Sequence, residues 1–254
     1  MSRQPTLKTK CAKCAMFFES SGFCANLTET ELVDLSNQSR TMDLKRGETF
    51  SEDQLRSWPI IAITSGVFSI QHLLEDGRKS IAALFMRGDI IDMRSFSRRN
   101  RGQLIALSKT EVCRLSPAVF ENIVATNPNA RHIVWDNLRD QSFRAQDHAA
   151  DLSKKQALEK LASFIFECKS RQQVNLTPGA VSIPIRRVDL AEYLGMQPET
   201  ISRCFKDLED RGIVEMKSLR AVNIKNIPVL RRIANGDKSA SVAKTHSIRI
   251  LSVA

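Results

Sequence analysis

The sequence has no long apolar run and no secretory leader. No stretch approaches the roughly 18 consecutive apolar residues that a membrane-spanning helix requires. The opening segment MSRQPTLKTK also lacks the apolar core of a signal peptide. We therefore expect a cytoplasmic protein without a membrane partner, in which persistent disulfides are rare. Three cysteines within fourteen residues near the start, Cys11, Cys14 and Cys24, accordingly point to metal or redox chemistry.

Motifs for catalysis are missing as well. The chain has no glycine-rich phosphate loop, no H-E-x-x-H motif and no recognisable pair of nucleophile and base. Its four histidines, His72, His132, His148 and His246, stand in no recognisable axial-ligand context for haem. The sequence therefore favours neither an enzyme nor a haem protein.

Positive charge, by contrast, is abundant. The formal net charge of +10 and the sequence pI of about 9.6 favour a polyanionic partner, and nucleic acid is the first candidate. Many basic soluble proteins bind no nucleic acid, so charge alone indicates a direction and no more. With 254 residues, of which 42% are hydrophobic, the chain can form two modest domains with real cores.

Short apolar segments separated by turns follow a cysteine-rich arm, which we assign to residues 1–26. Within residues 27–127, Thr28 and Glu31 have the spacing of a capping box and predict one short helix. Strands are predicted at ETFSEDQ, IIAITSGVFSIQHLL, KSIAALF and GQLIALSKTEVCRLS, with turn signals at Gly47, Gly66, Gly77 and Gly88. This spacing predicts an antiparallel double-sheet roll.

A long helix is predicted over residues 128–152. Along it, apolar or small residues recur at alternating steps of three and four: Trp135, Leu138, Ser142, Ala145, Ala149 and Leu152. We call these six positions the seam, because such a heptad-like stripe is typical of two helices packed along their length and predicts a homodimer. The serine and the two alanines make the seam weak, which would suit a dimer that forms and dissolves. The alternative is that the stripe packs on the protein's own roll.

Residues 153–235 have the pattern of three helices followed by a hairpin, and we expect the Ser-rich, basic tail 236–254 to be poorly ordered. SKKQALEKLASFIFECKSRQ is predicted to form the first of these helices. The most specific stretch is RRVDLAEYLGMQPETISRCFKDLEDRGIVEM, residues 186–216. Gly195 stands where a tight turn needs a positive φ, and Pro198 suits the first position of the following helix. The stretch therefore predicts a helix-turn-helix.

Polar residues cluster at the N-terminal end of its second helix, the end that enters the major groove of double-stranded DNA. Glu199, Ser202 and Arg203 are predicted to contact bases, because arginine binds guanine and glutamate accepts from cytosine. Phosphate contacts are predicted for Arg186, Arg187, Thr200 and Lys206, and for Lys217 and Arg220 in a two-stranded wing, GIVEMKSLRAVNIKN. The alternative is a three-helix packing unit with an exposed charged face. Turn glycine, N1 proline, wing and basic charge together favour DNA binding.

A roll, a long helix and a C-terminal winged helix-turn-helix together resemble the CRP/FNR family of bacterial transcription regulators. The matching phrases are KRGETF, ITSG, RGDII, LSKKQALEKLASFI and DLAEYLGMQPETISR, and the similarity extends from about residue 11 to residue 235. The E-x-x-S-R pattern of Glu199, Ser202 and Arg203 looks like the FNR branch rather than the cyclic-AMP branch. The resemblance implies an α+β fold with a cyclic-nucleotide-binding-like jelly roll and RNA polymerase as a partner. It also implies palindromic DNA sites with half-sites like TTGAT.

The resemblance also implies a role for the cysteines. FNR-type oxygen sensors hold a [4Fe–4S] cluster on three N-terminal cysteines and one in the roll, and Cys113 in TEVCRLSP matches the distant position. Cys11, Cys14, Cys24 and Cys113 are thus the implied ligands. The spacing here, C-x2-C-x9-C, is longer than the usual C-x2-C-x5-C, but a loop absorbs the extra residues at small entropic cost. The alternatives are zinc on the same thiolates, redox sensing by the thiols themselves, and no metal at all.

Three more expectations follow from the resemblance. In low oxygen, the cluster would order the arm and roll against the long helix and favour the dimer. The turn at Gly77 and Arg78 matches a family loop that touches RNA polymerase. Cyclic-nucleotide binding is not expected, because the segment IIDMRSFSRRNRGQ after RGD lacks the family's phosphate cassette and the pair Arg94-Ser95 is misplaced.

Overall fold

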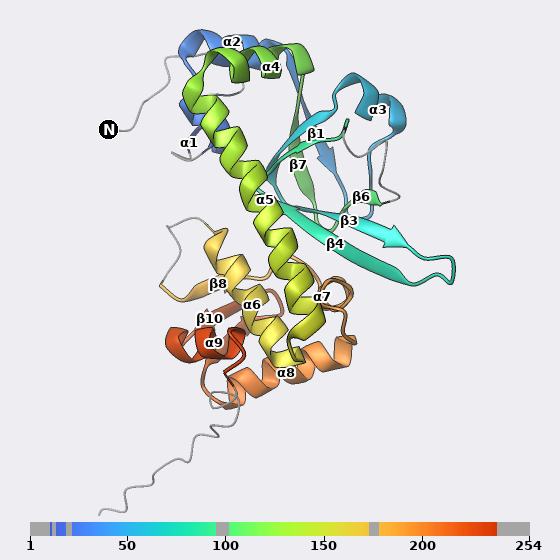
Figure 1. Ribbon diagram of the computed structural model, residues 1–254, viewed down its shortest axis with the longest axis vertical. Coiled ribbons are helices and arrows are strands. Elements are labelled where there is room, and N and C mark those ends of the chain that lie inside the picture. The colour runs from blue at the N-terminus through green and yellow to red at the C-terminus, as the bar shows by residue number, and fades with distance from the viewer. Residues whose placement is uncertain (1–10, 12–13, 19–21, 95–101, 173–177, 238–254) are drawn as a thin grey trace, which may run out of the picture. The chain divides into compact units, whose positions relative to one another are not determined.

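The computed structural model describes residues 11, 14–18, 22–94, 102–172 and 178–237. It divides into two units, residues 1–148 and 149–254, and the long helix α5 (Pro128–Lys154) contributes to both (Figure 1). Because the described residues end at 237, the tail predicted for residues 236–254 lies almost entirely outside them.

Two antiparallel sheets form the body of the first unit. One has the strand order β1-β7-β2-β5 and the other the order β4-β3-β6. The strands are β1 (Ser39–Leu44), β2 (Ile60–Ser65), β3 (Val67–Leu73), β4 (Lys79–Met86), β5 (Ile90–Asp92), β6 (Gln103–Ala106) and β7 (Thr110–Leu115). Every pairing in both sheets is antiparallel. The predicted antiparallel β-roll is therefore confirmed.

Strand β2 is buried on both faces. Ile61 and Ile63 lie in the core between the sheets, whereas Ile60 and Ala62 lie in a second core. That second core lies against the helices α2 (Glu29–Asn37), α4 (Pro117–Thr126) and the start of α5. Because both faces are covered, the segment is a continuous apolar run rather than an alternating one.

Several local predictions in this unit are confirmed. The Thr28 hydroxyl accepts from the backbone N–H of Glu31, whose carboxylate accepts from the Thr28 N–H, so α2 begins with the predicted capping box. Gly66 turns between β2 and β3 with φ +83°, and a Cβ there would lie 2.5 Å from the carbonyl oxygen of Lys109. Glycine is therefore required at this turn, because the φ is positive and because a side chain would clash with the Lys109 carbonyl.

The prediction of a strand at ETFSEDQ is wrong. Residues Glu52–Ser57 form helix α3 instead, because Ser51 and Gln54 make a second capping box: the hydroxyl accepts from the Gln54 N–H and the Gln54 side-chain oxygen accepts from the Ser51 N–H. The sequence analysis also missed β1 and β5. Both are short strands whose partners, β7 and β2, lie far away in the chain.

The second unit joins helices to a three-stranded sheet of order β8-β10-β9. Its elements are α6 (Ala157–Ser170), β8 (Ala180–Ser182), α7 (Arg187–Leu194), α8 (Pro198–Asp210), β9 (Val214–Ser218), β10 (Ala221–Ile224) and α9 (Ile227–Ala234). The helix predicted from residue 153 begins at Ala157, because α5 extends to Lys154 and Gln156 caps a new helix together with Glu159. Strand β8 was not predicted, and it makes the wing sheet three-stranded.

Candidate functional site

Helices α7 and α8 form the predicted helix-turn-helix. Gly195 ends α7 in the left-handed conformation, with φ 62°, and Pro198 opens α8 at its first turn. The backbone N–H of Met196 donates to the carbonyl of Ala191 at 2.9 Å and closes the turn. The side chains that face inward from the two helices are buried: Leu190, Ala191, Leu194, Ile201, Cys204, Phe205 and Leu208. The packing of the two helices thus follows from these residues.

The three predicted base contacts all lie on the exposed side of α8. Glu199, Ser202 and Arg203 are exposed on its first two turns. The Ser202 hydroxyl donates to the carbonyl of Pro198 at 3.1 Å, and Arg203 Nη2 donates to the Thr200 hydroxyl at 3.3 Å. Both hydrogen bonds lie within α8, so contacts inside this helix position the polar side chains.

The two arginines that precede α7 differ in their surroundings. Arg186 is exposed at the N-cap position. Arg187 is half-buried, and its guanidinium carbon lies 3.3 Å from the centroid of the Phe205 ring. Burial lowers the pKa of Arg187 to about 10, which still leaves it charged at neutral pH. Arg187 therefore packs α7 against α8, a role that the sequence did not indicate, and its phosphate contact stays a prediction.

The wing carries exposed positive charge beside one carboxylate. Lys217 and Arg220 are exposed at the hairpin, together with Leu219 at its tip. Glu215 lies 2.5 Å from Lys217 Nζ and 2.7 Å from Lys225 Nζ. Hydrogen bonds from these two lysines lower the pKa of Glu215 to about 2. The sequence analysis missed Lys225, because only the pairing of β9 with β10 brings it beside Glu215.

The four predicted cysteine ligands share one environment in the first unit. Cys11 is buried, and Cys24 and Cys113 pack against the core cluster that contains it. Burial raises the pKa of Cys24 well above its usual value, and the charges of Cys113, Cys11 and Cys14 raise it further. The structure therefore brings Cys113, on strand β7, within electrostatic reach of the N-terminal cysteines.

A bound cationic group would favour the thiolate form of these cysteines. Burial and the charges of the other three cysteines disfavour ionisation of Cys24, and bound iron or zinc would offset that effect. Met16 and Phe23, between the N-terminal cysteines, are both 2% exposed and exclude water from the core beside them. Within the described residues, no group of three or more His, Cys, Asp or Glu side chains is placed so that it could hold a metal ion. Ligation by these cysteines remains a prediction.

The remaining cysteines lie elsewhere. Cys168 on α6 and Cys204 on α8 are buried, at 1% and 8% exposure, and burial raises the pKa of each thiol. Both belong to the second unit, where they are small buried hydrophobes.

All six seam positions on α5 are exposed in this chain. Trp135 is 65% exposed and Leu138 46%, which is unusual for such large apolar side chains. A different face of α5, with Ala130, Ile133 and Val134, packs against the roll. The alternative in which the stripe packs on its own roll is therefore wrong, and pairing of two seams stays a prediction.

Two further predicted positions lie on the roll. Gly77, with φ +84°, and Arg78 form the exposed turn between β3 and β4, where Arg78 pairs with Asp76 at 2.7 Å. Arg94 is paired with Asp92 at 2.7 Å and with Glu121 at 2.5 Å. Its neighbour Ser95 lies outside the described residues.

None of the helices in the described part of the chain combines the length and apolar character needed to cross a membrane.

Comparison with known protein families identifies both units. Residues 41–127 match the model of the cyclic nucleotide-binding domain, and residues 159–233 match that of the Crp-like helix-turn-helix domain. The nitrogen fixation regulation protein FixK of Bradyrhizobium diazoefficiens is 29% identical over 206 residues, which cover 80% of this chain and 85% of that protein. The fumarate and nitrate reduction regulatory protein of Escherichia coli is 27% identical over 220 residues, which cover 85% of this chain and 87% of that protein.

Solved structures share the fold. FixK2 from Bradyrhizobium japonicum superposes with a TM-score of 0.62 at 23% identity, covering 78% of this chain and 96% of that one. A variant of CooA from Carboxydothermus hydrogenoformans gives a TM-score of 0.63 at 18% identity, covering 78% of this chain and 88% of that one. At these identities the superpositions establish the fold alone.

Proposed function

Since this chain belongs to the CRP/FNR family of DNA-binding transcription regulators, which are not enzymes, we propose that it controls transcription in response to oxygen. In this proposal Cys11, Cys14, Cys24 and Cys113 are the ligands of a [4Fe–4S] cluster. When bound, the cluster would supply iron–sulfur chemistry that is sensitive to oxygen.

One observation carries the proposal: the pKa of Cys24 is raised by Cys11, Cys14 and Cys113 as well as by burial. Cys11, Cys24 and Cys113, from two distant segments, lie at one apolar core, and the charge of Cys14 also acts on Cys24. Deprotonating Cys24 is unfavourable there, and a cluster with four thiolate ligands would offset that cost. The names of several relatives, which refer to fumarate and nitrate reduction, agree with a role in low-oxygen metabolism.

The cysteines would tie two parts of the first unit together. Three of them lie in the proposed sensor arm, residues 1–26, and Cys113 lies on β7 within the proposed roll, residues 27–127. Ligation of all four holds the arm on the core that also contacts the start of α5. We propose that this orders the dimerisation helix, residues 128–152, so that the exposed seam pairs with a second copy.

The proposed DNA-binding domain, residues 153–235, would then act in pairs. In a dimer, two copies of α8 enter successive major grooves about one helical turn apart. Glu199, Ser202 and Arg203 contact bases in half-sites like TTGAT. Phosphates are held by the basic residues and Thr200 named above, with Lys225 added by the wing. The exposure of all three base-contacting side chains supports this assignment.

RNA polymerase is the proposed protein partner, through the exposed turn at Gly77 and Arg78. We propose no cyclic nucleotide as ligand, although the roll matches the cyclic nucleotide-binding domain. The pairing of Arg94 with Asp92 and Glu121 supports this view, since two carboxylates already occupy the arginine that follows the RGD turn.

A second candidate uses the same thiols without iron and sulfide. Zinc is also bound by four thiolates, and thiols near one another can sense oxidants by forming disulfides. The same crowding of Cys24 by three other cysteines supports this candidate. Metal analysis separates the two.

The test is anaerobic purification followed by iron and acid-labile sulfide counts, with absorption spectra during exposure to air. About four irons and four sulfides per chain, lost in air together with specific DNA binding, are expected. Zinc, or no metal with unchanged DNA binding in air, would contradict the proposal and leave a regulator of this family with another signal.

A further inference from the structure

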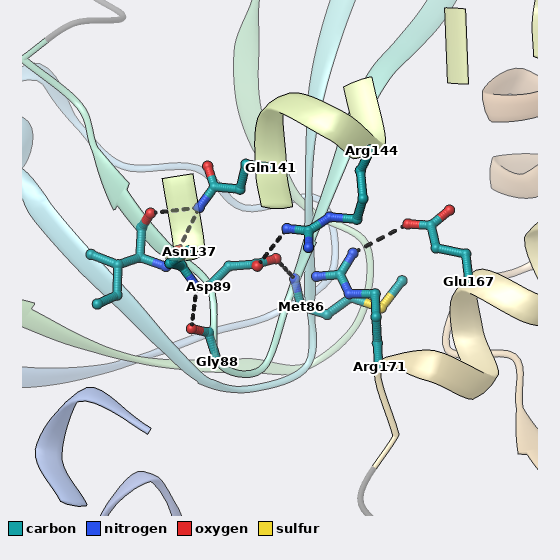
Figure 2. A network of polar contacts seen from close by, with 9 residues as sticks. Met86, Gly88, Asp89, Asn137, Gln141, Arg144, Glu167 and Arg171 are labelled. Atoms are coloured by element: carbon teal, nitrogen blue, oxygen red, sulfur yellow. Dashed lines mark hydrogen bonds and ion pairs between the residues drawn. The ribbon is translucent and has the colours of Figure 1, made fainter. Parts of the chain in front are cut away.

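A polar network fastens α5 to the segment between strands β4 and β5. The Asn137 side-chain oxygen accepts from the backbone N–H of Ile90 at 2.9 Å, and its Nδ2 donates to the carbonyl of Gly88 at 3.0 Å. Gln141 Nε2 donates to the carbonyl of Ile90 at 2.9 Å (Figure 2). Two amide side chains of the helix thus engage both backbone polar groups of Ile90.

An ion pair reinforces the same contact. The Asp89 side chain is only 5% exposed, and it accepts from Arg144 Nη2 at 2.8 Å and from the backbone N–H of Met86 at 2.8 Å (Figure 2). A buried carboxylate held in this way helps to fix the position of the turn, because moving Arg144 away would take a cation from a buried negative charge.

The backbone of Ile90 also connects directly to the cysteine site. On β2, Ala62 pairs with Cys113 of β7 on one side and with Ile90 of β5 on the other. Cys113, Ala62 and Ile90 therefore form one row across the sheet, in which directly paired residues are neighbours on the same face. Ile90 lies in the core cluster that contains Cys11, and Cys113 packs against that cluster.

The helix carries this contact to the seam. We call Asn137, Gln141 and Arg144 the anchors. Each of them directly precedes a seam residue, namely Leu138, Ser142 and Ala145, respectively. Successive residues of an α-helix point about 100° apart, so the anchors and the seam occupy different faces of one rigid helix. A shift or rotation of the anchors consequently moves the seam by a similar amount.

We infer that Asn137 and Gln141 are positioning residues that communicate the state of Cys113 to the seam, through the row Cys113, Ala62 and Ile90. The inference rests on the proposed function, in which Cys113 is a cluster ligand, and adds the route by which ligation controls the dimer. Ligation at Cys113 fixes this row, the amides fix α5 on it, and the seam takes the orientation in which two copies pair.

The experiment compares Asn137→Ala/Gln141→Ala with Gln146→Ala. Gln146 is an exposed glutamine of the same helix whose side chain donates to Ser142 at 3.2 Å. For each full-length chain, iron and sulfide content, the dimer dissociation constant by sedimentation, and hydrogen exchange of the α5 amides are measured. The measurements are made anaerobically and again after iron is stripped with a chelator.

The double variant is expected to retain the iron and sulfide content of the parent chain. Its α5 amides should exchange as fast with iron as without it. The ratio of dimer dissociation constants between stripped and loaded chains should shrink about tenfold relative to the parent. The Gln146→Ala chain should keep the parental ratio. An unchanged ratio and unchanged α5 exchange in the double variant would overturn the inference.

A second pair of variants keeps the test decisive if the alanine variant fails to fold. Gln141→Glu preserves the side-chain length but removes the donor to Ile90, and Gln146→Glu places the same charge on the exposed face. A smaller ratio of dimer dissociation constants between stripped and loaded chains in Gln141→Glu than in Gln146→Glu supports the inference. Equal ratios in the two variants overturn it.

The result also separates this inference from the proposed function. If the parent chain contains no iron, the proposed function fails. The positioning role is then decided on the metal-free chains: faster α5 exchange in Gln141→Glu than in Gln146→Glu supports it, and equal exchange overturns it.

Discussion

The two units present their functional residues in different ways. In the second unit, the predicted base-contacting residues lie within two turns of α8, and their hydrogen bonds join residues three or four positions apart. In the first unit, the proposed cysteine site joins an N-terminal segment to strand β7, and its thiols repel one another when ionised. The predicted DNA-binding surface therefore forms by itself, whereas the proposed cysteine site would be completed by the group that it binds. Each variant below should consequently affect one unit and spare the other.

The largest effect is expected for Cys113→Ala. Removing one of four thiolate ligands should reduce iron and sulfide to near zero in anaerobic preparations. The control is Cys168→Ala, the same change at a buried cysteine of the second unit, which should keep the parental iron content. Normal iron and sulfide in Cys113→Ala would place the fourth ligand elsewhere and remove the contrast between the units.

Arg203→Ala tests the predicted base recognition by α8 in the second unit. Loss of a bidentate contact to guanine should weaken binding to the specific site by about 1–3 kcal/mol per half-site, while iron content and dimerisation stay parental. Titration of labelled DNA with specific and scrambled sites measures the change. Arg232→Ala, at an exposed arginine of α9 paired with Asp237, is the matched control. An unchanged site preference in Arg203→Ala would refute the recognition assignment.

Leu138→Glu, in the first unit, should weaken the dimer while the single chain keeps its fold. Leu138 is 46% exposed, so the single chain tolerates a charge there, but two seams would bring like charges together. We expect the dimer dissociation constant to rise about tenfold or more in sedimentation experiments. Phe143→Glu, at a position that is 55% exposed and outside the seam, should leave it unchanged. Equal effects of the two variants would argue against the seam as the dimer interface.

The smallest effect is expected for Glu215→Gln in the wing. Removing this carboxylate releases Lys217 and Lys225 from their ion pairs, so DNA affinity at low salt should rise. The slope of log affinity against log salt should steepen by up to about one unit for each additional phosphate that a released lysine neutralises. A salt titration against the parent chain measures both, and an unchanged slope would mean that these lysines bind no phosphate.

The ion pairs of Glu215 should also make the stability of the folded chain depend on pH. The pKa of Glu215 in the folded chain is about 2, below its usual value of 4.5, because Lys217 and Lys225 donate hydrogen bonds to it. The stabilising effect is therefore fully present above about pH 4.5 and is lost as the pH falls toward 2. Thermal unfolding of the parent and Glu215→Gln chains should differ at neutral pH and converge in acid. A constant difference down to pH 2 would contradict the assignment.

Much of the second unit could be predicted from sequence because its signals are local. Gly195 and Pro198 mark the turn and the start of α8, and the buried positions follow the helical period. The burial of Arg187 over Phe205 could not be predicted, since it depends on how α7 crosses α8. Strand β8 was missed for a similar reason: three residues have little pattern of their own, and pairing with β10 makes them a strand.

Local sequence signals predicted less of the structure of the first unit. The capping box at Thr28 was recognised, while the equivalent one at Ser51 was overlooked in a segment assigned to a strand. The seam was recognisable from its period, but the period does not tell which side of α5 faces the roll. Asn137 and Gln141 also lie on the side that faces the roll, but their partners at Gly88 and Ile90 are backbone atoms and leave no trace in a sequence pattern.

By itself, the sequence determined the helix-turn-helix, the glycine turns, the heptad-like stripe and the spacing of the N-terminal cysteines. These depend on residue type and short-range spacing, which act before distant segments meet. The tertiary structure alone decided which strands pair, and hence that Cys113 lies near the N-terminal cysteines, one strand from Ala62 and two strands from Ile90. Strand pairing joins segments far apart in the chain, so its outcome depends on the packing of the whole roll rather than on any local pattern.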